Sequence, residues 1–348
     1  MDKITKDNLD KLAAQLAEKQ PVFAPQEDSS GVVAYDWYSG KKKLVWGVKT
    51  RRSAKEAYFP QSETLLKYRI RDGKVEQENK EFTSALVLMG IHPCDARSFT
   101  MLDKLFGWDY DDERWQERRK NSVIISIACP GPISEGCFCM NFRGNPFGTE
   151  NVDVLLAKDG DAYHVKVASE KGEKFIKDNS KFFSEDGDEG RFGQLQQKAE
   201  TSFVNSPRID DPDIWKRMQQ NFDHPIWREL SLKCIECGIC TWLCCTCHCF
   251  DIQDEGGFGG KRERIWDGCS FKEFTKMPSH QPRPAYFQRY RQRIMHKYGY
   301  FVERFGMIAC VACGRCIDHC PTNIDITQIL NKLNQVLPAE GEKAVCNE

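Results

Sequence analysis

The first hydrophobic positions of the chain recur at helical spacing. Four of them share one face of a predicted helix, and Pro21 ends the pattern: Leu9, Leu12, Ala13 and Leu16. Charged residues interrupt this stretch and no apolar core follows, so it predicts an amphipathic helix and not a signal peptide. No run approaches the roughly 20 apolar residues of a membrane span. We therefore expect a cytoplasmic protein.

Two short apolar runs flank a second helical pattern. SALVLMGI (84–91) and SVIISIA (122–128) predict buried strands, and DARSFTMLDKLF (95–106) between them places its apolar residues on one helical side. This order predicts a βαβ unit with parallel strands. Alternation over 152–167 predicts a hairpin that turns at 158–161. A polar stretch from 169 to 213 then separates this part from the rest.

The second part of the chain has mainly helical patterns, over 213–230 and 285–306. Its glycine-rich segment 256–264 lacks the spacing of a phosphate-binding loop and predicts a flexible loop. The fold class is therefore α+β. We expect an N-terminal α/β domain with a βαβ unit and a hairpin over residues 1–213, and a helical two-cluster ferredoxin-like domain over 214–348.

Cysteine content changes the picture, because the chain has seventeen cysteines. The number is odd and no export signal is evident, which favours metal binding over disulfides. The net charge of −1 gives no general attraction to nucleic acid or to an anionic membrane. The mixture of Arg, Lys and aromatic residues over 283–304 is better explained by nearby anionic clusters or by a docking face for another subunit than by nucleic-acid binding.

Eight cysteines form two runs with the spacing C-x2-C-x2-C-x3-C. This spacing is typical of bacterial ferredoxins with two [4Fe–4S] clusters, in which the fourth cysteine of each run serves the other cluster. The predicted ligand sets are Cys234, Cys237, Cys240 and Cys320 for cluster 1, and Cys310, Cys313, Cys316 and Cys244 for cluster 2. Zinc is the competing hypothesis, although it does not need two repeated four-cysteine runs.

Details of the two runs refine this hypothesis. Gly238 and Gly314, each after the second cysteine of its run, suit a backbone that bends close to inorganic sulfide. Sixty-five residues, largely helical in pattern, separate Cys244 from Cys310. This separation favours the helical type of ferredoxin domain, as in fumarate reductase iron–sulfur subunits, an argument by fold analogy.

A further group of cysteines follows the two predicted strands of the first half: Cys94, Cys129, Cys137 and Cys139. The carboxyl ends of parallel strands lie at one sheet edge, so these thiols are expected to converge there. They predict a third [4Fe–4S] cluster, with reduced structural cysteines and zinc as alternatives. His92 is expected to pack or hydrogen-bond beside this group and not to act as a base.

Several residues have no assigned place in these clusters. Cys245 stands where proline usually follows the fourth cysteine, and is either an extra ligand or a buried thiol. Three more thiols and an imidazole are candidate ligands of an additional centre or packing residues around the clusters: Cys247, Cys249, Cys269 and His280.

Five segments, in this order, resemble one family: IHPCDARSFTMLDKLF, SIACPGPISEGCFC, HPIWRELSLKCIECGICTWLCCTCHC, RERIWDGC and CVACGRCIDHCP. The family comprises the β subunits of soluble cytoplasmic [NiFe] hydrogenases (sulfhydrogenases), the iron–sulfur subunit of anaerobic sulfite reductase, and related subunits of flavin oxidoreductase–heterodisulfide reductase complexes. The resemblance extends from about Val87 to Leu330. Cys245 departs from the family, which usually has proline there.

The resemblance implies an electron-transfer subunit with no evident catalytic site of its own. It would pass electrons between a flavin- and NAD(P)-binding reductase subunit, which holds the FAD, and a catalytic subunit of hydrogenase, sulfite reductase or heterodisulfide reductase type. Two alternatives stay open. One is an enzyme whose unusual cluster near Cys247, Cys249 and Cys269 binds substrate. The other is a redox or iron sensor that binds nucleic acid through residues 283–304.

Overall fold

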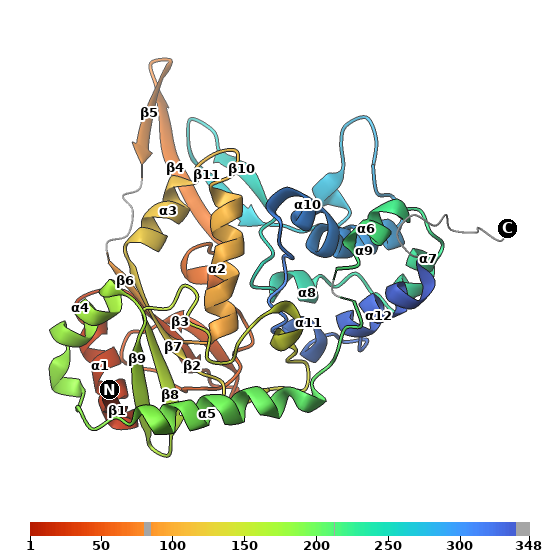
Figure 1. Ribbon diagram of the computed structural model, residues 1–348. Helices are drawn as coiled ribbons and strands as arrows, with labels where there is room; N and C mark the ends of the chain where they lie inside the picture. Colours follow the sequence, from red (N-terminus) through yellow and green to blue (C-terminus); the bar gives the residue numbers. More distant parts are fainter. Residues whose placement is uncertain (80–84, 212, 339–348) are drawn as a thin grey trace.

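The larger of two β-sheets lies in the N-terminal part of the computed structural model, which describes residues 1–79, 85–211 and 213–338 (Figure 1). Ser84 and Cys346 lie outside the described residues. The strand order is β1-β9-β8-β7-β6-β2-β3. Its strands are β1 (Asp2–Thr5), β2 (Val22–Glu27), β3 (Val33–Trp37), β6 (Leu86–Ile91), β7 (Ser122–Ile127), β8 (Val154–Asp159) and β9 (Ala162–Val167). Parallel pairing of β6 with β7 confirms the βαβ unit, and the β8–β9 pair confirms the hairpin.

Helices cover both faces of this sheet (Figure 1). One face packs on α1 (Lys6–Ala17) and α4 (Glu170–Asp178), and the four apolar positions predicted in α1 are all buried. The other face packs on a short 3-10 helix (Ala54–Ala57), α2 (Pro93–Phe106), α3 (Glu113–Lys120) and α5 (Glu189–Thr201). Alternate residues of each strand point to opposite faces, so Leu88 and Met89 serve different cores. The sheet is therefore buried on both sides.

The smaller sheet corrects one expectation. Its order is β10-β11-β4-β5, from β4 (Ser62–Arg71), β5 (Lys74–Asn79), β10 (Phe250–Gly256) and β11 (Gly259–Trp266). The prediction of a flexible loop over 256–264 was wrong, because β11 pairs antiparallel with β4. Arg264 on β11 is buried and forms ion pairs with Glu63 and Asp112. The hairpin thus joins the second half of the chain to the first.

The C-terminal part is mainly helical (Figure 1). Its α-helices are α6 (Trp215–Gln220), α7 (Ile226–Ser231), α8 (Ile239–Trp242), α9 (Tyr286–Met295), α10 (Phe301–Phe305), α11 (Arg315–Asp318) and α12 (Ile326–Val336). The single helix predicted over 213–230 is wrong, since Pro225 separates α6 from α7. A π-helical turn (His296–Tyr300) joins α9 to α10, and short 3-10 turns occur at Cys139–Phe142, Ser180–Phe182, Ser202–Asn205 and Glu273–Thr275. Within the described ranges, no helix is long and apolar enough to cross a membrane.

Two cysteine-bearing loops meet where the N-terminal and C-terminal parts touch. The Phe138 backbone N–H donates to the Ala312 carbonyl at 3.1 Å, and the Gly136 N–H donates to Asp318 Oδ1 at 3.1 Å. Gly314 has a φ of 77°, and a Cβ added to it would collide with the carbonyl of Gly136. Glycine at this position therefore permits the two backbones to touch.

The close approach at Gly314 predicts a strong effect of the substitution Gly314→Ala. Gly306 is a matched control, because its φ of 68° is similar and nothing lies within 4 Å of an added Cβ. Gly306→Ala should cost about 1–3 kcal/mol of stability from backbone strain alone. Gly314→Ala should cost more, because the Gly136 loop must also move away. Anaerobic thermal unfolding measures both variants, and equal losses would contradict the close contact.

Candidate functional site

The two cysteine runs adopt the same backbone conformation. In each run the residue before the second cysteine has a positive φ, 56° at Glu236 and 53° at Ala312. In each, a glycine with positive φ follows, 72° at Gly238 and 77° at Gly314, and a short helix then begins. The expectation that these glycines allow a tight bend is confirmed. Equal spacing in the sequence therefore produces two loops of equal shape.

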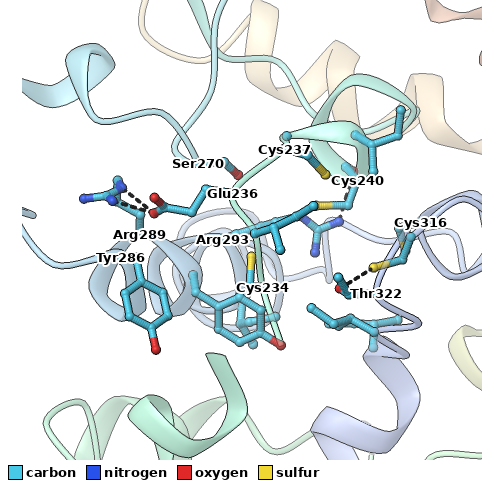
Figure 2. A pocket seen from close by; sticks show the side chains of 18 of the residues that line it. Cys234, Glu236, Cys237, Cys240, Ser270, Tyr286, Arg289, Arg293, Cys316 and Thr322 are labelled. Carbon is cyan, nitrogen blue, oxygen red and sulfur yellow. Dashed lines mark hydrogen bonds and ion pairs between the residues drawn. The ribbon is translucent and has the colours of Figure 1, made fainter. Parts of the chain in front are cut away.

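The first cavity lies beside α8 and α9 (Figure 2). All four predicted cluster 1 cysteines line it, together with Cys316 of the other set: Cys234, Cys237, Cys240 and Cys320. It encloses about 60 Å³, more than the roughly 10–15 Å³ that one water occupies. The carboxylate of Glu236 on its wall pairs with Arg289 at 2.5 Å. The fourth cysteine of the distant run thus joins the first three.

Polar atoms on the wall of the first cavity test whether a cluster fits. Among the described residues, Tyr290 Oη and Arg293 Nε are buried without a hydrogen-bond partner. Both residues line this thiol-rich space. Buried donors normally have acceptors, and cluster sulfurs accept hydrogen bonds from the surrounding protein. The donor set therefore fits an iron–sulfur cluster.

The second cavity lies deeper. Its wall contains all four predicted cluster 2 cysteines: Cys244, Cys310, Cys313 and Cys316. Cys245 also lines it, is buried, and its thiol hydrogen-bonds to those of Cys244 and Cys313. Those two contacts raise the pKa of Cys245 well above the usual value. Cys245 therefore touches two predicted ligands, and the question of an extra ligand stays open.

The third cavity lies at the carboxyl ends of β6 and β7. The four cysteines predicted to converge there all line it: Cys94, Cys129, Cys137 and Cys139. Burial raises the pKa of Cys139 to about 12, and it also raises the pKa of Cys94 and of Cys129 well above normal. Iron binds thiolates, so loading this cavity with iron must release protons.

His92 packs against the third cavity as expected. Its Nε2 lies 2.9 Å from the Val48 carbonyl, and its Nδ1 lies 3.4 Å from Cys129 Sγ. Burial lowers the pKa of His92, which favours the neutral ring. The imidazole therefore orients a predicted ligand through a hydrogen bond.

Charged residues that the sequence analysis missed join the third cavity to the second. Lys49 Nζ contacts Ser134 Oγ at 2.6 Å, Asp318 Oδ2 at 2.5 Å and Cys137 Sγ at 3.6 Å. Burial alone would lower the pKa of Lys49, but Cys137, Cys313 and Asp318 outweigh it and leave the pKa raised. No local spacing marks Lys49 or Asp318 in the sequence, since they meet only in the folded chain.

The remaining candidate ligands do not gather around one point. The Cys249 thiol hydrogen-bonds to Cys269, and Cys247 hydrogen-bonds to Cys244. His280 is exposed and contacts Ser279 at 2.9 Å. In the part of the chain that the structure describes, no group of three or more Cys, His, Asp or Glu side chains is arranged to hold a single metal ion. This finding disfavours a zinc site and does not support a substrate-binding centre at these residues.

Comparison with known proteins adds independent information. Residues 233–324 match the family described as a 4Fe-4S dicluster domain. The chain is 29% identical over 279 residues to sulfhydrogenase 2 subunit beta of Pyrococcus furiosus, covering 77% of this chain and 81% of the relative. No solved structure matches the chain. The domain match spans both cysteine runs and indicates iron–sulfur clusters.

The third cavity generates a prediction about iron content. Cys94→Ser should remove about four irons per chain, because a cubane loses one of its four thiolate ligands. Cys269→Ser is the matched control, since Cys269 is a buried cysteine that lines none of the three cavities. It should keep the wild-type iron content. Iron and sulfide analysis of anaerobic preparations measures both, and an unchanged content in Cys94→Ser would refute the third ligand set.

Proposed function

Because the chain belongs to the family of iron–sulfur β subunits of sulfhydrogenases, we propose that it relays electrons between two other subunits of an oxidoreductase. The proposed ligands of three [4Fe–4S] clusters are the cysteine sets of the first, second and third cavities. When bound, such clusters supply one-electron transfer. The polypeptide holds them at fixed separations and limits their contact with water.

The observation that carries this proposal is that the cavities share walls in one linear order. Cys316 and Arg293 line both the first and the second cavity. Cys313 and Ala312 line both the second and the third. The second cavity therefore has a neighbour on each side, as a relay requires.

Both ends of this order have exposed residues nearby. Cys237 is exposed, and the neighbouring Ile235 is 62% exposed. At the other end Met140, which follows Cys139, is 41% exposed. These two places give electrons an entrance and an exit. In contrast, the buried residues between them leave the middle site accessible only through its neighbours.

The identities of the partners belong to the same proposal. One partner is a flavin- and NAD(P)-binding reductase subunit that carries the FAD. The other is a catalytic subunit, for which the similarity to a sulfhydrogenase subunit favours the hydrogenase type over sulfite reductase or heterodisulfide reductase types. We also propose a cytoplasmic location, because clustered thiols that bind iron require a reducing compartment. The boundary between the two domains is proposed near residue 213.

Anaerobic co-purification of the tagged chain tests the proposal. The expected preparation contains about twelve irons and about twelve sulfides per chain, from three cubanes. It should also contain a flavoprotein and a catalytic oxidoreductase subunit. A colourless or zinc-loaded chain would contradict the relay. An iron-loaded chain without redox partners would instead contradict its place in a complex.

A further inference from the structure

Arg293 lies on α9 at the wall between the first and second cavities, where Figure 2 shows it between Cys234 and Cys240. Its side chain is buried, with the residue 8% exposed. One guanidinium nitrogen donates to the Cys240 carbonyl at 3.1 Å. Its Nε has no hydrogen-bond partner among the described residues. This guanidinium therefore lacks part of the environment that a buried cation needs.

Neighbouring arginines on the same helix are paired differently. Arg289 pairs with Glu236 at 2.5 Å, and Arg291 pairs with Asp223 at 3.0 Å. The described residues provide no such carboxylate partner for Arg293. A buried charge without a counter-charge is strongly unfavourable, so an anion is expected beside it.

The anionic groups near Arg293 belong to two ligand sets. Burial alone would lower the pKa of Arg293, but nearby thiolates outweigh it and leave the pKa raised. Cys240, a ligand proposed for the first cluster, has the largest of these effects, followed by Cys316 of the second. The guanidinium therefore faces negative charge on both sides.

Lys297 has a narrower environment. Its Nζ lies 3.0 Å from Cys244 Sγ, 3.0 Å from Thr246 Oγ1 and 3.1 Å from the Ala309 carbonyl. It lines the second cavity and not the first. This ammonium therefore faces a single ligand set.

We propose that Arg293 is the shared counter-charge of the first and second clusters and raises the reduction potential of both, whereas Lys297 acts on the second alone. The proposal rests on the proposed cluster assignments. Reduction adds a negative charge, which a nearby cation stabilises, and the low dielectric of the interior strengthens this effect. Arg293 is thus a positioning residue for charge and takes no part in ligation.

Redox titration followed by electron paramagnetic resonance, on the anaerobically purified complex, tests this assignment. Arg293→Gln should lower the equilibrium constant for reduction of both clusters about tenfold, which is about 59 mV for a one-electron couple. Lys297→Gln should produce a comparable shift in the second cluster only. Arg293→Lys keeps the charge and should shift both potentials less than Arg293→Gln does.

Arg291→Gln is the matched control, because it removes the same charge from the same helix while its guanidinium contacts Phe222 and Asp223. It should leave both potentials nearly unchanged. Cys237→Ser and Cys310→Ser, each of which changes one ligand, assign the signals to the two clusters.

Iron content is measured first, so that failure of the proposed function is recognised as a separate result. A wild-type complex without iron refutes the relay itself. With iron present, unchanged potentials in Arg293→Gln, or an equal shift in Arg291→Gln, overturn the assignment. If Arg293→Gln fails to fold, Lys297→Gln still decides, since a shift in both clusters or in neither contradicts the division of roles.

Discussion

A buried ion pair between the two halves of the chain is the contact on which the arrangement of the three cavities depends. Arg315 donates to both carboxylate oxygens of Asp95, at 2.8 and 2.7 Å, and also to Thr50. Asp95 directly follows Cys94, and Arg315 lies between Cys313 and Cys316. The pair therefore holds the third cavity against the second. Removing one partner of such a pair typically costs about 3–5 kcal/mol, so the contact is difficult to open.

Charge balance is the second constraint, because the relay gathers many thiolates in a small volume. Three buried cations lie among them, Lys49, Arg293 and Lys297, each with its pKa raised by neighbouring cysteines. Arg315 has a carboxylate partner and connects the halves of the chain. In contrast, Arg293 depends on the contents of the cavities for its counter-charge. A cation in this position has an electrostatic role and not only a structural one.

The sequence predicted the parts of the site that depend on local spacing. The cysteines of the first two cavities could be assigned from spacing, because a run of this kind forms the same loop twice. The third group could be located because parallel strands end at one sheet edge. Lys49 and Arg293 could not be assigned, since only tertiary packing brings them to the thiols. Likewise β11 looked like a loop, because its partner β4 lies far upstream in the chain.

An anaerobic crystal structure of the complex, with anomalous scattering measured at the iron edge, tests the central claim most directly. The account predicts three separate groups of iron, one in each cavity, with the group bound by Cys244, Cys310, Cys313 and Cys316 in the middle. Iron in only two cavities, single metal ions, or a third iron group away from Cys94 would contradict it.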